Sequence, residues 1–95
     1  FMTPARCYLG HYVDDEKPSC FENKYTEGKP LIDYVNVIVE TGKKLGVPVL
    51  DLYHTLGLDP HDEECYQAYT ADGLHFNDAG HTVIAQRLKE FIETL

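Results

Sequence analysis

The stretch that decides the fold is residues 72–81, Asp-Gly-Leu-His-Phe-Asn-Asp-Ala-Gly-His. It places a carboxylate at Asp72 and an imidazole at His75, in a segment too rich in Gly and Asn to lie within a helix. An Asp that precedes a His by three residues can accept a hydrogen bond from one ring nitrogen, which leaves the other to take a proton from a nucleophile. We therefore interpret this stretch as a candidate active-site loop followed by an amphipathic helix.

The Asp-x-x-His spacing occurs three times, so the context of each copy must distinguish between them. The copies are Asp51/His54, Asp72/His75 and Asp78/His81. The first follows an apolar run typical of a strand, and its carboxylate can also face a cleft. The third falls inside a helical pattern, where residues three apart share a face that is usually solvated. The second copy lies in a loop between elements, where catalytic groups are commonly held on a rigid scaffold.

Residues 72–81 resemble the last conserved block of the SGNH, or GDSL-like, hydrolases, which is an Asp-x-x-His followed by a glycine and a helix. The resemblance implies that Asp72 and His75 belong to a Ser-His-Asp triad, with His75 the general base and Asp72 its orienting group. Thr3-Pro4 is similar to the end of the family's fourth strand, and residues 46–52 are similar to its next turn and strand. The implied fold class is α/β: the C-terminal portion of a three-layer α/β/α, flavodoxin-like SGNH fold with an incomplete parallel sheet.

The other blocks of that family do not occur in the 95 residues. There is no Gly-Asp-Ser block, no glycine block and no Gly-x-Asn-Asp block for an oxyanion hole. Ser19 is the one serine, and its setting is neither a nucleophile elbow nor a Gly-Asp-Ser-Leu block. We therefore expect residues 1–95 to be the C-terminal part of a single SGNH hydrolase domain. The parent protein is expected to hydrolyse carboxylic esters of acylated sugars or lipids without a cofactor or metal, and the isolated chain to be inactive.

Periodicity predicts the first half of the chain as a strand end, a long loop and a helix. Residues 1–3 are short and apolar and end at a proline, whereas residues 5–29 show no sustained period and form a long Tyr-rich loop. Apolar residues at helical spacing predict a helix over about residues 30–45, which begins at Pro30 and ends at Gly46.

In the second half, a continuous apolar run predicts an edge strand over residues 47–52. Residues 53–76 are predicted as a loop with room for a short helical turn. A last helix over about residues 77–94 is capped by Asn77 or Asp78 and carries a wide apolar stripe. Because two strands cannot cover the apolar faces of two helices, we expect a partner: the missing N-terminal half or a second copy of the chain.

Composition excludes several classes of function. With 43% hydrophobic and 25% charged residues, the chain is expected to be globular. The net charge of −8 opposes binding to nucleic acid or to anionic membrane surfaces. No apolar run approaches the roughly 20 residues of a membrane-spanning helix. Cys7 and Cys20 are either bridged or reduced, and the sequence leaves this open.

Two alternatives to an ester hydrolase remain open. One is a non-catalytic interaction module. The other is a metal-binding domain, for which the ligand types suit zinc although the spacings match no zinc motif. Its candidate ligands are His54, His61, Cys65, His75, His81, Asp59, Asp62, Glu63 and Glu64.

Overall fold

The N-terminal segment pairs in parallel with the segment that follows the first long helix. Thr3 N–H donates to the Leu50 carbonyl (3.0 Å), Leu50 N–H donates to the Phe1 carbonyl (2.8 Å), and Met2 and Leu50 form a parallel bridge. The computed structural model describes residues 1–10, 13–17 and 29–95. The strand predicted over residues 47–52 is wrong in its extent, because the pairing involves one bridge at Leu50 and a helix already begins at Leu52.

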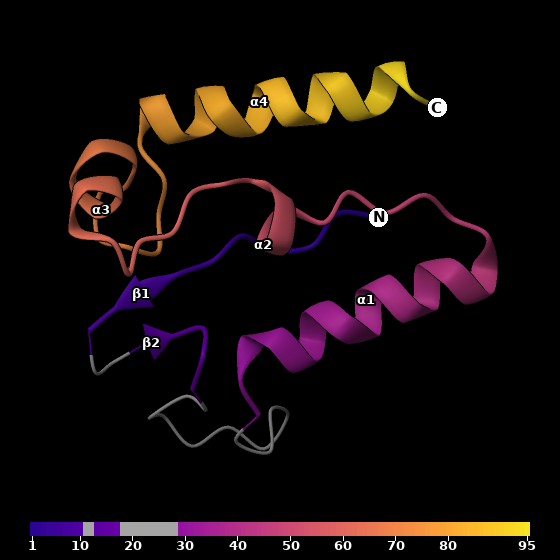
Figure 1. Cartoon of the computed structure of the whole chain (residues 1–95), viewed down its shortest axis with the longest axis horizontal. Helices are drawn as coiled ribbons and strands as arrows, with labels where there is room; N and C mark the ends of the chain where they lie inside the picture. The colour runs from indigo at the N-terminus through magenta and orange to yellow at the C-terminus, as the bar shows by residue number, and fades with distance from the viewer. Residues whose placement is uncertain (11–12, 18–28) are drawn as a thin grey trace.

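Helix α1 spans Leu31–Leu45, close to the predicted bounds (Figure 1). Pro30 precedes the helix as its N-cap residue instead of being its first turn. The helix ends at Gly46, which adopts φ +67°, a left-handed conformation that glycine reaches without steric cost. Val35 and Gly42 are buried on the face toward the paired segments, and a Cβ at position 42 would collide with the Val49 side chain.

Two short helices lie where the sequence predicted a loop over residues 53–76. Helix α2 spans Leu52–Thr55 and helix α3 spans Glu63–Tyr69. Each begins at an aspartate whose carboxylate accepts a backbone N–H: Asp51 from His54 and Asp62 from Glu64. Helices this short contain too few turns to produce a recognisable apolar period. The prediction of a loop with room for a short helical turn therefore underestimated the helical content of this segment.

A β-hairpin corrects the prediction of a structureless loop over residues 5–29. Strand β1 (Tyr8–Leu9) pairs antiparallel with strand β2 (Val13–Asp14), and Tyr8 lies opposite Asp14. Below them, Cys7 N–H donates to the Asp15 carboxylate (2.8 Å) and Asp15 N–H donates to the Cys7 carbonyl (3.1 Å). Because each strand has only two residues, the sequence cannot show the alternation of apolar and polar residues that indicates a strand. Cys7 is a free, buried thiol, and Cys20 lies outside the described residues.

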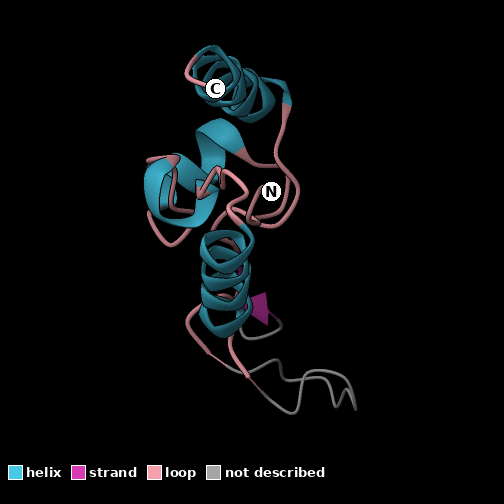
Figure 2. Cartoon of the chain, turned by 90° about the vertical axis from the view of Figure 1, so that its right-hand side faces the viewer, coloured by secondary structure: helices cyan, strands magenta, loops and turns pink. Residues whose placement is uncertain are grey.

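Helix α4 spans Asp78–Glu93, and the Asn77 side chain caps it by accepting from Gly80 N–H (3.0 Å), so Asn77 is the cap of the two that the sequence allowed. Its apolar face covers the core. Figures 1 and 2 show α4 and α1 on opposite sides of the paired N-terminal and central segments. The core consists of Leu50, Leu52 and Leu56, with Val83, Ile84 and Phe91 of α4 packed against them.

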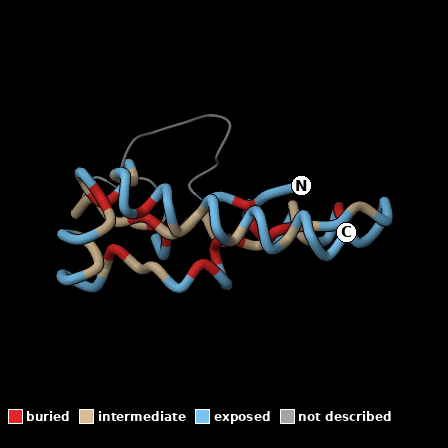
Figure 3. The backbone as a smooth tube through the Cα atoms, turned by 90° about the horizontal axis from the view of Figure 1, so that it is seen from above, coloured by how far each residue is buried: buried red, intermediate tan, exposed pale blue. Residues whose placement is uncertain are grey.

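The described residues therefore form a small mixed helical domain with short strand pieces and no complete sheet. Buried residues gather along the central segments, whereas the long helices keep exposed faces (Figure 3). As expected, apolar side chains of both long helices stay in contact with solvent: Tyr34, Val37, Leu45, Leu88 and Ile92. No helix in the described ranges combines the length and the apolar character needed to cross a membrane.

Substitution of Gly80 by Ala tests the packing of α4 on α3. A Cβ at this position would meet the Tyr69 carbonyl oxygen and the Phe76 ring, and the backbone oxygen cannot rotate away. We expect Gly80→Ala to lower the free energy of unfolding by about 1–3 kcal/mol, although alanine favours a helix. Urea unfolding measures the change, with Ala79→Ser, which adds one atom at an exposed neighbour, as the control. Equal midpoints for the two variants would contradict the packing argument.

A candidate active-site loop and the charged cluster beside it

Residues 70–76 form a closed loop between α3 and α4. Ala71 N–H donates to the His75 carbonyl (2.8 Å), and Thr70 and Phe76 form an antiparallel bridge. At the tip, the Gly73 carbonyl accepts from Tyr8 N–H of β1 (3.0 Å). Gly73 has φ +87°, and a Cβ there would collide with the Tyr8 carbonyl oxygen. Only glycine therefore fits this contact, which ties the loop to the hairpin.

The loop brings Asp72 and His75 together. Asp72 Oδ2 lies 2.7 Å from His75 Nδ1, while Asp72 Oδ1 accepts the backbone N–H groups of Leu74 (2.9 Å) and His75 (2.7 Å). The carboxylate thus orients the ring and closes the turn. The His75 side chain is 73% exposed. Within the described part of the chain, its Nε2 has no hydrogen-bond partner.

These hydrogen bonds keep Asp72 ionised. The backbone N–H of His75, then its ring, then the backbone N–H of Leu74 lower the pKa of Asp72 to about 2. Because the carboxylate is an acceptor at neutral pH, the proton shared with His75 resides on Nδ1. Nε2 of the neutral ring then carries the lone pair, which is the arrangement that general-base catalysis requires.

The other two Asp-x-x-His copies differ from Asp72/His75 in what their side chains contact. In the first, His54 Nδ1 lies 2.7 Å from Asp51 Oδ2, the same distance as in the candidate site. Desolvation opposes ionisation of Asp51, but hydrogen bonds from His54 lower the pKa of its carboxyl. The hydroxyl of Thr3 also lies 3.3 Å from Asp51 Oδ1, so this carboxylate joins two distant segments. In the third copy, the His81 ring contacts the Asn77 carbonyl (3.0 Å).

A cavity of about 500 Å³ lies beside the candidate loop. The neighbours of His75 in sequence, Leu74 and Phe76, line one side of it, and residues 4–7 and the start of α1 line another. His75 is not among the lining residues. Most of the lining surface is apolar, and five residues add charge: Arg6, Asp14, Asp15, Lys17 and Lys29. The cavity is thus adjacent to the loop, on the side that the residues flanking His75 face.

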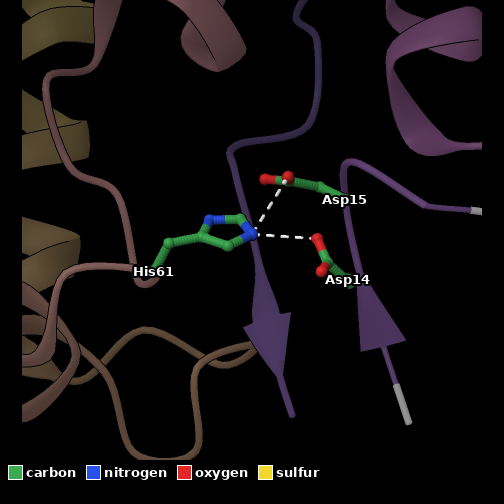
Figure 4. A group of neighbouring side chains, drawn as sticks. All are labelled: Asp14, Asp15 and His61. Carbon is green, nitrogen blue, oxygen red and sulfur yellow. Dashed lines mark hydrogen bonds and ion pairs between the residues drawn. The ribbon is translucent and has the colours of Figure 1, made fainter. Parts of the chain in front are cut away.

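Sequence reasoning missed a second group of charged side chains, which Figure 4 shows. His61, in the turn before α3, places Nε2 2.9 Å from Asp14 Oδ1 and 3.6 Å from Asp15 Oδ1. Its Nδ1 lies 2.6 Å from Asp59 Oδ1. The available signal in the sequence was the acidic run at residues 14–16.

The alternative that the chain binds a metal ion is supported by only one small group of possible ligands. Asp14, Asp15 and His61 each offer one ligand atom, and these atoms lie within 4.8 Å of one another. Of the residues proposed as ligands from sequence, only His61 belongs to this group. Within the described ranges, His54, Cys65, His75 and His81 join no such group. The predicted pairing of Asp72 with His75 is present, whereas the predicted metal set is dispersed.

The chain is similar in fold to solved protein structures. No family model matches the chain, and no curated protein matches it. A solved structural genomics target from Lactobacillus plantarum is 29% identical, with a TM-score of 0.76, over 99% of this chain and 43% of that one. A second solved structure is 31% identical, with a TM-score of 0.77, over 100% of this chain and 42% of that one. The chain thus spans less than half the length of the solved proteins that it matches.

The depressed pKa of Asp72 is directly measurable. A carboxyl with a lowered folded-state pKa contributes stability above its unfolded value of roughly 3.9, and this contribution is lost as the pH falls toward 2. We expect the ¹³Cγ resonance of Asp72 to titrate near 2 in an NMR pH series. In His75→Ala the backbone donors remain, so we expect the midpoint to rise only part of the way toward the ordinary value. A midpoint near the ordinary value in the unaltered protein would contradict the hydrogen-bonded geometry.

Proposed function

We propose that this chain supplies the acid–base half of an ester hydrolase of the SGNH type. The observation that carries the proposal is the Asp72–His75 pair, with Nδ1 held at 2.7 Å by an ionised carboxylate and the His75 side chain largely exposed. The resemblance of residues 72–81 to the family's last block supports it. The parallel pairing of Met2 with Leu50, with long helices on opposite sides, is compatible with one end of a three-layer α/β/α fold.

In the proposed reaction, Nε2 of His75 accepts the proton of a serine hydroxyl as the serine oxygen attacks the ester carbonyl. Asp72 keeps the ring in the tautomer with the proton on Nδ1 and stabilises the imidazolium that forms. The imidazolium then gives its Nε2 proton to the departing alcohol, which leaves an acyl-serine. Water, deprotonated by the same nitrogen, hydrolyses this intermediate and returns the serine.

The serine and the oxyanion donors must come from a segment outside residues 1–95. Ser19 is the one serine of the sequence, in a setting unlike a nucleophile turn. The solved proteins similar to this chain are more than twice its length, and apolar residues of α1 and α4 are exposed. These observations support an N-terminal half of the same domain as the partner. A second copy of the chain is the competing partner.

The substrate we propose is a short-chain or carbohydrate ester. The loop over residues 5–29 is polar and Tyr-rich, and a strongly apolar lid is not evident in the sequence. Most of that loop, including Tyr12, Phe21 and Tyr25, lies outside the described residues. The cavity beside Leu74 and Phe76 gives space for a small acyl or sugar group close to the loop.

Activity measurements on the full-length protein test the roles of Asp72 and His75. With an acetyl ester as substrate, we expect Asp72→Asn to reduce kcat roughly ten-thousandfold, because the ring then takes the wrong tautomer. His75→Ala should reduce kcat to at least the same extent. His54→Ala is the matched control, since His54 has the same spacing and the same 2.7 Å bond to an aspartate. A loss of activity in the control, with Asp72→Asn unaffected, would assign the activity to the other pair.

A fluorophosphonate probe, which forms a covalent bond with an activated serine, locates the nucleophile. We expect one labelled serine in the full-length protein, outside residues 1–95, and no labelling in His75→Ala. The isolated 95-residue chain should hydrolyse no acetyl ester and take up no probe. Labelling of Ser19, or activity of the isolated chain, would overturn the division of the triad between segments.

A further inference from the structure

One imidazole joins the β1–β2 hairpin to the turn that precedes α3 (Figure 4). His61 Nε2 faces Asp14 of β2, and His61 Nδ1 faces Asp59 of its own turn, at 2.9 and 2.6 Å. Both contacts are hydrogen bonds only if each nitrogen carries a proton, because a carboxylate at neutral pH accepts and does not donate. The geometry therefore matches an imidazolium with two carboxylate partners.

The charges around the ring favour its protonated form. Asp14 of β2 and the adjacent Asp15 bring two carboxylates close to the ring, and Asp59 adds a third from the turn of His61 itself. Arg6 pairs with Asp15, Glu16 and Asp59, and Lys17 lies 4.0 Å from Asp14. Two of these three carboxylates, Asp14 and Asp59, have His61 as a hydrogen-bond partner.

The pKa directions agree with this geometry. Partial burial of His61 opposes its charge, but the hydrogen bonds to Asp14 and Asp59 and the charge of Asp15 raise its pKa above the ordinary value. Burial likewise opposes ionisation of Asp14 and Asp59, and their hydrogen bonds with His61 outweigh it and lower both pKa values. The ring and its two partners thus stabilise one another's charged forms.

The hairpin also contacts the candidate active-site loop, through Tyr8. The Tyr8 ring stacks on the His61 ring, with centroids 4.8 Å apart and planes inclined by 32°. The backbone N–H of Tyr8 donates to the carbonyl of Gly73, the residue between Asp72 and Leu74. One residue, Tyr8, therefore contacts both the charged cluster and the tip of the loop.

We propose that His61 is a positioning residue: as an imidazolium it ties the hairpin to the turn before α3, and so holds Tyr8 against the loop that carries Asp72 and His75. Its effect on turnover rests on the proposed function, whereas its effect on the loop does not. A group with a raised folded-state pKa stabilises the folded state fully below about 6.5, its unfolded value, and loses this effect as the pH rises through the folded value. The contact between Tyr8 and Gly73 therefore loosens at alkaline pH.

A divalent cation is the competing occupant of this cluster, since Asp14, Asp15 and His61 are suitable ligands. However, Asp15 already accepts three hydrogen bonds, two from the Arg6 guanidinium and one from Cys7 N–H. A cation would have to displace the Nε2 proton and lie close to the guanidinium charge. Both features favour a hydrogen-bonded proton over a divalent cation between His61 and the carboxylates.

NMR on the 95-residue protein tests the proposal without an activity assay. In the unaltered chain at about pH 6.5, where an ordinary histidine is half protonated, we expect both ring nitrogens of His61 to be predominantly protonated. We expect Tyr8 N–H to exchange with solvent roughly tenfold faster in His61→Gln than in the matched control His54→Gln, because a charge-assisted hydrogen bond is lost. A neutral His61 ring, or equal exchange in the two variants, would overturn the proposal.

Turnover in the full-length protein separates this proposal from the proposed function. We expect His61→Gln to lower kcat on an acetyl ester about tenfold with little change in KM. In the unaltered protein, kcat should fall at alkaline pH as His61 loses its proton, and this fall should be absent in His61→Gln. Unchanged kcat in an active esterase would overturn the positioning role and leave the Asp72–His75 assignment standing. Fast Tyr8 exchange in a protein without esterase activity would support the positioning role alone. Stoichiometric Zn²⁺ uptake that shifts the His61 resonances would overturn it in favour of a metal site.

Discussion

The parallel pairing of residues 1–3 with residues 48–50 is the interaction on which the rest of the structure depends. Its backbone hydrogen bonds of 2.8–3.0 Å bring the start of the chain against its middle. The pairing places the Thr3 hydroxyl beside Asp51 and within 3.2 Å of Tyr53 N–H, and it buries Leu50. Helix α4 packs on the resulting core from one side and α1 lies on the other, so both long helices depend on these few bonds for their positions.

Local chemistry accounts for the geometry of the aspartate–histidine pairs but not for their roles. Asp51/His54 and Asp72/His75 each form a 2.7 Å bond, and in each pair the carboxylate also accepts the histidine's backbone N–H. What separates them is their surroundings. Asp51 begins a helix and contacts a segment distant in the sequence, whereas Asp72 bonds within its own loop. The His75 side chain is 73% exposed and that of His54 is 52% exposed, so the second arrangement leaves its imidazole more open to a reacting group.

The exposed surfaces of the two long helices are consistent with a larger assembly. Both carry apolar residues in solvent on faces that the short paired segments do not cover. A domain of this size gains little stability from its own core, because it buries a small share of its surface. Further burial of apolar surface by another segment would add to that stability at about 25 cal/mol per Å². The greater length of the similar solved proteins agrees with this view.

The sequence by itself determined the two long helices, a cap at Asn77 or Asp78 for the second of them, and the Asp72–His75 pair. Each of these features depends on residues within about four positions of one another, so spacing and residue type are sufficient. The tertiary structure decided the hairpin, α2, α3 and the cluster around His61. The bond between Asp14 and His61 joins residues 47 positions apart, and the elements that hold them are only a few residues long. No local pattern records such a contact, because it forms only when the paired segments bring the hairpin and the turn together.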